Sequence, residues 1–285
     1  MAGGRGRLTR PIPRAGLGLC NRPPPDMIPM SMLLGLISDI HGNMAALEAV
    51  IRDLEAVGAE KVLCLGDVVG YGPFPGECLD LVRRCGAVLM GNHEEALLHG
   101  AENFNPRAKR AIDWTREHLK TSGDEAARMN RWHILQNLQL HCKVGDFLFT
   151  HASPRRPTRE YVMPRDVANQ PKMDEIFSLI EHVCFVGHTH LPGVFLTDRT
   201  FNTPAQLWNQ TYFIEPGEKA LVNIGSVGQP RDGDRRACYV ILDTDPSAPR
   251  AVYRRVEYDV EATATAIEAN DSLDDYLAER LRQGR

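Results

Sequence analysis

LLGLISDIHGN, residues 33–43, begins as an apolar run and ends on Asp39 and His41, two side chains that can bind a metal ion. A continuous apolar run is typical of a strand that is buried on both faces. Apolar residues at helical spacing follow over residues 44–57, and Gly58 ends them. The order predicts a buried strand and then a helix, with polar side chains where the strand ends.

The strand-then-helix pattern repeats along the first half of the chain. Strands are predicted over 61–68 and 87–90, with a helix over 76–85 between them, and further helices over 93–99, 106–119 and 124–135. Such a β-α-β-α-β beginning implies a parallel sheet and an α/β fold. The second half is mostly strand, over 138–144, 147–150, 183–186, 194–197, 211–214, 220–224, 237–242 and 251–258, before two closing helices over 261–268 and 273–281. Because no repeat or linker divides residues 33–285, we expect a single domain.

Composition limits the classes of function. The 285 residues are 43% hydrophobic, which is enough for a sizeable core. A formal net charge of −4 lacks the basic excess of a nucleic-acid-binding protein, so we expect no stable nucleic-acid partner. The sequence contains no run of 18 apolar residues, so we expect no transmembrane helix and no membrane partner. The seven cysteines are odd in number and contain no C-x-x-C, which favours the reducing cytoplasm over a disulfide framework.

The first 32 residues differ in composition from the rest. They hold five arginines against one aspartate and are rich in proline and glycine, which excludes a stable amphipathic helix. We expect a disordered tail or a start codon placed too early, since Met27, Met30 and Met32 lie just before the first predicted strand. A targeting segment is the alternative.

Seven oxygen and nitrogen donors follow the predicted strands in one ordered series: Asp39, His41, Asp67, Asn92, His151, His188 and His190. Because ligands gather at the carboxyl ends of strands in open α/β sheets, we expect these side chains to converge. The spacing of two in D-x-H and H-x-H predicts that each pair projects from the same side of an extended segment, while Ile40 and Thr189 point away. Oxygen and imidazole donors without thiolate suit borderline divalent metals and do not resemble a structural zinc site.

Each unit by itself has an ordinary explanation. A D-x-H at a strand end can be a surface turn, G-N-H-E can merely begin a helix, and H-x-H can be a pair of hydrogen-bonded core imidazoles. The ordered set is what indicates a metal site. The remaining histidines are isolated, and we expect surface or hydrogen-bonded roles for them: His99, His118, His133, His141 and His182.

From about Leu33 onward, the order of these motifs resembles the calcineurin-like metallophosphoesterase superfamily. The motifs are D-x-H, G-D-x-x-x-x-G-P at 66–73, G-N-H-E at 91–94, the single His151, and G-H-T-H at 187–190. The chain looks most like the compact bacterial branch. Residues 66–73, 151–154 and 223–231 are similar to members described as diadenosine tetraphosphatase or protein-phosphatase-like. The resemblance implies a four-layer α/β/β/α sandwich of two mixed β-sheets flanked by helices.

Carried over by position, the resemblance implies a binuclear metal site. Asp39, His41 and His190 would bind one divalent ion, Asn92, His151 and His188 would bind the other, and Asp67 would bridge them. The ions would be drawn from Mn, Fe, Zn, Ni and Co, with Mn favoured. A hydroxide bridging the ions would attack phosphorus in line, without a covalent enzyme intermediate. His93, which follows Asn92, would be the acid beside the leaving oxygen.

The chain departs from the family's protein phosphatases at Gly70. In those enzymes an aspartate three residues after the bridging one orients the histidine. Its absence argues against a serine/threonine phosphoprotein substrate. From the resemblance we expect a phosphodiester or a dinucleoside polyphosphate, such as diadenosine tetraphosphate, as the substrate. A phosphomonoesterase or phosphoprotein phosphatase is the alternative within the same class. A catalytically idle interaction scaffold is the alternative of another class, but idle members lose ligands or the acid histidine, and here every position is filled.

Several further residues are candidates for contacts with a small phosphorylated substrate, possibly a nucleotide. Asn43 could contact phosphate or cap a helix. Gly225 and Ser226 could offer a backbone N–H to phosphate or form a tight turn. Arg155 and Arg231 could bind a phosphate chain or lie in solvated loops. The helical stretch 103–119 could form a wall of the cleft or pack on the sheet.

Overall fold

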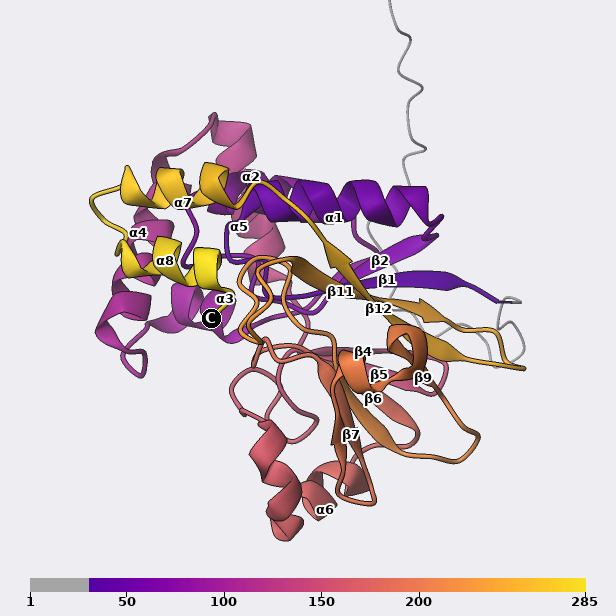
Figure 1. Cartoon of the computed structure of the whole chain (residues 1–285). Coiled ribbons are helices and arrows are strands. Elements are labelled where there is room, and N and C mark those ends of the chain that lie inside the picture. Colours follow the sequence, from indigo (N-terminus) through magenta and orange to yellow (C-terminus); the bar gives the residue numbers. More distant parts are fainter. Residues whose placement is uncertain (1–30) are drawn as a thin grey trace, which may run out of the picture.

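Two six-stranded mixed sheets form the centre of the fold in the computed structural model, which describes residues 31–285 (Figure 1). Residues 1–30, and with them nearly all of the tail expected at 1–32, lie outside the described residues. The first sheet has the order β3 (Ala87–Val88), β2 (Lys61–Cys64), β1 (Leu33–Ile37), β11 (Ala237–Asp243), β12 (Arg250–Val256) and β9 (Thr211–Phe213). Strands β1, β2 and β3 are parallel, and β11, β12 and β9 continue the sheet in antiparallel pairs.

The second sheet has the order β4 (His141–Val144), β5 (Phe147–Thr150), β6 (Val183–Val186), β10 (Ala220–Asn223), β7 (Gly193–Leu196) and β8 (Phe201–Asn202). Strands β5, β6 and β10 are parallel. Strands β4, β7 and β8 pair antiparallel at the two edges.

Side chains alternate across β1 and so build two cores. Leu34 and Leu36 lie in the apolar cluster between the sheets, where Phe149 of β5 and Phe185 of β6 stack at 5.4 Å. Ile37 points to the other face and joins the cluster under the helices. The two-residue period of a strand thus lets one short segment bury both of its faces.

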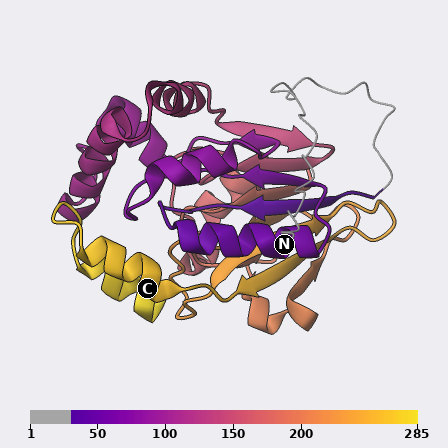
Figure 2. The same ribbon diagram turned by 90° about the horizontal axis from the view of Figure 1, so that it is seen from above.

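Helices cover the outer faces of both sheets: Figure 2 shows from above those over the first sheet, and Figure 1 shows the helix below the second. Five contribute apolar residues to the cluster on the first sheet: α1 (Met44–Ala56), α2 (Pro75–Val82), α3 (Asn92–His99), α4 (Pro106–Thr121) and α5 (Glu125–Gln136). Helix α6 (Gln170–Ser178), preceded by the 3₁₀ turn η1 (Pro164–Ala168), buries Ile176 and Phe177 against the second sheet. Helices α7 (Val260–Glu268) and α8 (Tyr276–Gln283) pack on each other and on Ala111 of α4. The expected α/β/β/α sandwich is confirmed.

The differences from the expected elements are local. The predicted strand over 33–40 ends at Ile37, and the residues after it form a loop. Helix α6 and the 3₁₀ turns η2 (Pro204–Gln206) and η3 (Trp208–Gln210) were not expected. Hydrogen bonding begins slightly before residue 33, since Met32 N donates to Thr244 Oγ1 at 3.0 Å and Met32 O accepts from Thr244 N at 3.0 Å.

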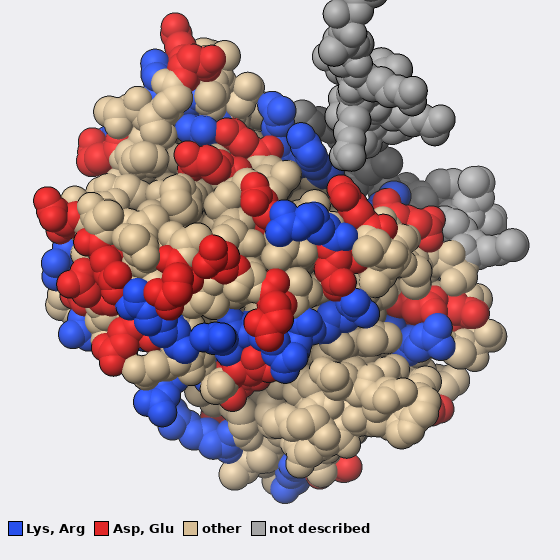
Figure 3. All heavy atoms as spheres, turned by 45° about the horizontal axis from the view of Figure 1, so that its top comes forward, with Lys and Arg blue, Asp and Glu red and all other residues tan. Residues whose placement is uncertain are grey.

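The outer surface carries both signs of charge. On the face shown in Figure 3, lysine and arginine side chains are interspersed with aspartate and glutamate. Ion pairs join neighbouring outer elements, such as Arg254 of β12 with Asp53 of α1 and Arg282 of α8 with Glu261 of α7. None of the helices in residues 31–285 is both long and apolar enough to span a bilayer.

Candidate metal centre

The seven candidate ligands meet where strands of both sheets end. The loops after β1 and β2 and the first turn of α3, which follows β3, carry the four from the first sheet, and the segments after β5 and β6 carry the three from the second. All seven are buried: Asp39, His41, Asp67, Asn92, His151, His188 and His190. The expected convergence at the carboxyl ends of strands is therefore observed, across two sheets rather than one.

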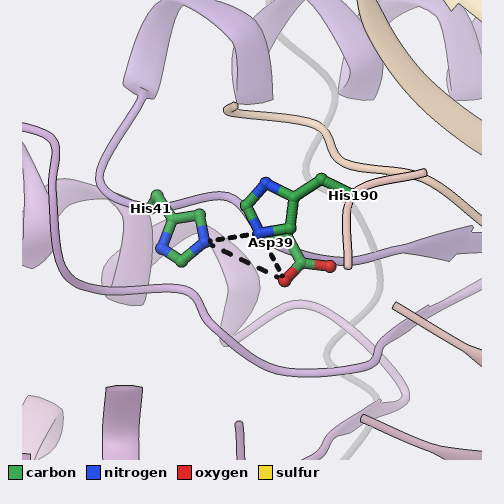
Figure 4. A group of neighbouring side chains, drawn as sticks. All are labelled: Asp39, His41 and His190. Carbon is green, nitrogen blue, oxygen red and sulfur yellow. Dashed lines mark hydrogen bonds and ion pairs between the residues drawn. The ribbon is translucent and has the colours of Figure 1, made fainter. Parts of the chain in front are cut away.

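Asp39, His41 and His190 form the first group (Figure 4). Nε2 of His190 lies 3.2 Å from Asp39 Oδ1 and 3.1 Å from Nε2 of His41. Nε2 of His41 is 3.9 Å from the same Asp39 oxygen. The three ligand atoms lie within 4.8 Å of one another, close enough to share one ion.

Asn92, His151 and His188 form the second group, together with Asp67. Nε2 of His151 is 3.1 Å from Asn92 Oδ1, 3.2 Å from His188 Nδ1 and 3.4 Å from Asp67 Oδ2. The same Asp67 oxygen is 3.8 Å from Nε2 of His41 in the first group. Asp67 thus lies between the groups, where a bridging carboxylate would lie.

Backbone carbonyls fix the tautomers of three of the histidines. Nδ1 of His41 lies 3.2 Å from Val69 O, Nδ1 of His151 lies 3.0 Å from Leu65 O, and Nδ1 of His190 lies 2.5 Å from Gln229 O. Because a carbonyl can only accept, the hydrogen of each neutral ring sits on Nδ1 and a lone pair on Nε2 points into the cluster.

A cation would satisfy these lone pairs. With the hydrogens of both neutral rings on Nδ1, the Nε2 atoms of His41 and His190 are two acceptors that lie 3.1 Å apart. Asp39 Oδ1 lies beside them without a hydrogen-bond donor, and His188 Nε2 also has no partner. Imidazole nitrogens bind first-row divalent ions at about 2.0–2.1 Å, so two nitrogens that share an ion at a right angle lie about 3 Å apart. The donor set fits divalent metal ions.

Charge and burial set the protonation of the cluster. Burial lowers the pKa of His41 and His190, and burial together with His151 lowers the pKa of His188 to about 3. Burial opposes ionisation of Asp39 and Asp67, yet neighbouring histidines hold both pKa values below their ordinary range. For His151, burial lowers the pKa but Asp67 outweighs it and raises the value to about 9. A proton on His151 would therefore compete with a metal ion.

The backbone of the ligand loops differs from the expected extended segments. Asp39, His41, Asp67, His188 and His190 have φ angles of 54°, 50°, 51°, 65° and 61°. Left-handed backbone is uncommon for residues other than glycine and costs free energy, which places these loops among the strained segments that cluster at functional sites. Ile40 does point away into the core, while Thr189 Oγ1 accepts a hydrogen bond from Asn223 at 2.9 Å. The prediction of extended D-x-H and H-x-H segments was wrong.

Glu94 is a supporting residue that the sequence did not single out. Its buried carboxylate accepts four backbone N–H bonds, from Asp67, Val68, Val69 and Gly91, at 2.7–3.1 Å. These bonds join the loop of Asp67 to the start of α3, which carries Asn92. Burial and the Asp67 charge raise the pKa of Glu94 to about 7. Its place in G-N-H-E was the available signal.

His93 lies beside the cluster in an aromatic surround. Its Nε2 is 4.0 Å from Asp67 Oδ2, and its ring is 4.5 Å from Tyr71 and 5.3 Å from Phe104. Its Nδ1 is buried without a partner and faces Gly70, where a Cβ would come within 2.0 Å. Burial lowers the pKa of His93 to about 4. His41, Asp67 and His93 also form a third group with ligand atoms within 4.8 Å.

The side chains of Asn43 and Ser226 form hydrogen bonds with neighbouring segments of the protein. Asn43 Oδ1 accepts from Ala46 N at the start of α1 and from Thr263 Oγ1, and its Nδ2 donates to Gly228 O. The cap is confirmed, and no amide atom is left for phosphate. Ser226 Oγ donates to Asp39 O at 2.8 Å and accepts from Gln229 N. Ser226 therefore holds a ligand loop.

The remaining candidates lie in different surroundings. Gly225 has φ 80°, and its N–H donates to Asn223 Oδ1, as in a tight turn. Arg155 pairs with Glu160 and Glu175, so its guanidinium is already occupied by carboxylates.

Arg231 differs from Arg155. Its guanidinium forms no ion pair within residues 31–285, and its Nε is buried without a hydrogen-bond partner. In the stretch 103–119, α4 packs on the first sheet as an ordinary helix, which was one of the two alternatives, and Phe104 contacts the His93 ring; a role as a cleft wall stays a prediction. The five isolated histidines join none of the three groups.

Comparison with known proteins supplies the context. A family model described as a calcineurin-like phosphoesterase superfamily domain matches residues 32–247. An uncharacterized protein of Methanocaldococcus jannaschii is 35% identical over 257 residues, 89% of this chain and 98% of that protein. The crystal structure of a metallophosphoesterase from Sphaerobacter thermophilus is similar with 33% identity and a TM-score of 0.74, covering 90% of this chain and 100% of that one. A hypothetical protein from Pyrococcus horikoshii shares the fold at 19% identity, with a TM-score of 0.68 over 89% of this chain and 99% of that one.

Proposed function

This chain belongs to the calcineurin-like phosphoesterase superfamily, and from that premise we propose that it is a two-metal phosphoester hydrolase acting on a phosphodiester or a dinucleoside polyphosphate. One observation carries the proposal. Nε2 of His41 and Nε2 of His190 face each other at 3.1 Å as lone pairs, beside Asp39 Oδ1. With both rings neutral and their hydrogens on Nδ1, no hydrogen bond among these atoms satisfies them, whereas a bound cation would.

Two ions share the seven side chains in this proposal. Asp39, His41 and His190 hold one, and Asn92, His151 and His188 hold the other. Asp67 serves both. When bound, divalent ions of this kind lower the pKa of a water molecule toward 7 and neutralise phosphate oxygens in an in-line displacement. Their four positive charges exceed the two carboxylate charges of Asp39 and Asp67, so the centre favours an anionic substrate.

His93 is the proposed acid. With its pKa lowered to about 4 by burial, the ring is neutral near pH 7 and carries one hydrogen. Nδ1 faces the backbone of Gly70 without an acceptor, so the hydrogen is useful only on Nε2, which lies on the side of Asp67. From there the neutral ring can donate a hydrogen bond to the oxygen of the leaving group, and a ring that has taken up a second proton can protonate that oxygen.

The substrate class rests on two features of this chain. The position of the orienting aspartate of protein phosphatases is Gly70, and the backbone there touches His93. This disfavours a phosphoprotein phosphatase. Arg231 also supplies a guanidinium without a carboxylate partner, which suits a phosphate chain. We favour manganese as the metal and, from the cysteine pattern, the cytoplasm as the compartment.

A substrate panel tests the proposal. Protein stripped with a chelator is assayed with Mn, Fe, Zn, Ni or Co added back singly. The substrates are p-nitrophenyl phosphate, bis-p-nitrophenyl phosphate, cyclic nucleotides and diadenosine tetraphosphate. We expect metal-dependent hydrolysis with the highest kcat/KM on diadenosine tetraphosphate or a diester. Preference for monoesters would favour a phosphomonoesterase, and inactivity together with no bound metal would favour an interaction scaffold.

A further inference from the structure

A cavity of about 480 Å³ opens beside the second group of candidate ligands. Thr189, which lies between His188 and His190 in the sequence, is on its wall, and so is Tyr161, whose ring lies 4.0 Å from the ring of His188. A substrate phosphate held at the cluster would therefore have its remaining atoms directed toward this space. The volume is within the range of small-molecule sites.

Two arginines line this cavity, and no carboxylate does. Arg165 and Arg231 form no ion pair with any aspartate or glutamate in residues 31–285. By contrast, Arg155 and Arg159 in the same part of the chain both pair with glutamates. Arg231 donates to Gln229 Oε1 at 2.9 Å and leaves its buried Nε unpartnered. A buried donor without an acceptor is costly, and a bound anion would relieve that cost.

The rest of the wall is apolar and aromatic. Met163 and Leu191 contribute aliphatic surface, and the Tyr161 ring, 51% exposed, offers a flat face. Aromatic faces of this kind stack on nucleobases, as they do in single-strand-binding proteins. Guanidinium groups beside an aromatic face make a surface for a base and a phosphate together.

We infer that this cavity binds the part of the substrate beyond the scissile phosphate, and that this part is a nucleoside carrying a further phosphate group. The inference rests on the proposed function and narrows it. Arg165 and Arg231 hold the further phosphate, and Tyr161 stacks on the base. A simple phosphomonoester would leave both arginines without a phosphate. A nucleoside polyphosphate contacts the arginines with its phosphate and Tyr161 with its base.

Arg280 of α8 adds positive charge near Arg231. Burial lowers its pKa, and the Arg231 guanidinium lowers it further, so the two cations repel each other. Arg280 forms no ion pair with an aspartate or glutamate within the described residues, and its Nε donates to Arg285 O at 2.7 Å. A polyphosphate bound beside Arg231 would ease this repulsion. Because Arg280 follows residue 247, it lies beyond the segment that the family model matches.

Calorimetric titration of metal-reconstituted protein tests the inference without requiring turnover. The probes are α,β-methylene-ADP, which resists hydrolysis between its phosphates, and inorganic phosphate, which needs only the metal centre. We expect the wild type to bind α,β-methylene-ADP at least about tenfold more tightly than phosphate. Arg231→Gln and Arg165→Gln should each weaken α,β-methylene-ADP about tenfold or more, as expected for loss of a charge-assisted hydrogen bond, and phosphate less than about threefold.

Two more variants complete the design. Tyr161→Leu should weaken α,β-methylene-ADP about fivefold or more and phosphate little, because only the base loses its contact. Arg199→Gln removes the same charge from the exposed turn between β7 and β8 and should change neither affinity. Equal affinity of the wild type for both probes, or equal loss of both in Arg231→Gln, would overturn the inference. Hydrolysis of bis-p-nitrophenyl phosphate by the same preparations tests the proposed function separately. A failure of the proposed function can therefore be distinguished from a failure of the inference about the cavity.

Discussion

Nε2 of His41 lies 3.1 Å from Nε2 of His190, and the other nitrogen of each ring faces a backbone carbonyl. The two rings come from different sheets, since His41 follows β1 and His190 follows β6. Folding therefore forces two lone pairs together from positions 149 residues apart. A bound cation would offset the energy of that contact, and this is the physical basis for the proposed metal centre.

Replacing His93 tests proton donation to the leaving group. We expect His93→Ala to lower kcat about 10²- to 10⁴-fold on substrates with poor leaving groups and much less on nitrophenyl esters, with unchanged metal content. His99→Ala, on the same helix but outside the cluster, serves as the control. Full turnover of poor leaving groups by His93→Ala would remove the acid role.

Gly70 is expected to be essential because of what its Cα faces. A Cβ there would come within 2.0 Å of His93 Nδ1, and φ is 87°. We predict that Gly70→Ala displaces His93 and lowers kcat at least about tenfold without loss of metal. Gly58→Ala is the matched control, because φ is 75° but nothing lies within 4 Å of the added Cβ. It should cost about 1 kcal/mol of stability and leave kcat unchanged. Equal kcat values for the two variants would contradict this account.

Glu94 is expected to hold the Asp67 loop. In Glu94→Gln one acceptor oxygen becomes an NH₂ group that faces backbone donors, so we predict a loss of about 1–3 kcal/mol in the free energy of unfolding. The variant should also need more metal for half-maximal activity. Glu95→Gln removes the same charge next to it and loses only a partly exposed ion pair with Arg159, so it should cost under about 1 kcal/mol. Urea unfolding measures the free energy of unfolding of both variants. Equal losses in the two would show that the hydrogen bonds of Glu94 to the Asp67 loop do not matter more than a surface charge.

Asp53 gives a pH-dependent prediction away from the centre. Its carboxylate accepts from Arg254 and from Tyr239 Oη, and the Arg254 hydrogen bonds hold the pKa of Asp53 below its ordinary value of 3.8 despite burial. A carboxylate whose pKa is lower in the folded state stabilises that state at pH values above its pKa in the unfolded chain. The contribution is lost as the pH falls through its pKa in the folded state. Asp53→Asn should cost about 1–2 kcal/mol at pH 7 and progressively less below about pH 4. The exposed Glu55→Gln is the control and should change the free energy of unfolding by less than about 0.5 kcal/mol at pH 7.

Local patterns predicted the fold and the residues that the structure brings together in the candidate metal cluster. Each ligand follows an apolar run that forms a strand, and the order of the motifs identified both the sandwich and the cluster. Helix α6 was not expected because Pro171 and its polar neighbours give a weak helical signal, whereas Ile176 and Phe177 find their core only in the folded chain.

The support of the site depends on contacts between distant segments. Tyr161 reaches His188, Phe104 reaches His93, and Glu94 reaches the loop of Asp67, and no local period encodes these contacts. The left-handed backbone of His41 and His190 is likewise imposed by tertiary structure, since neither residue favours it. For the same reason Arg155 and Arg231 look equivalent in the sequence, although only Arg155 has carboxylate partners.

Metal content per chain decides whether the seven side chains bind two ions. Protein reconstituted with Mn²⁺ and freed of excess ion is assayed by elemental analysis, alongside His190→Ala and Asp67→Ala. We predict two ions per wild-type chain, about one in His190→Ala, which loses a ligand of the first group only, and fewer still in Asp67→Ala, which loses the shared ligand. Wild-type protein that binds no stoichiometric metal, or His190→Ala that keeps both ions, would contradict this prediction.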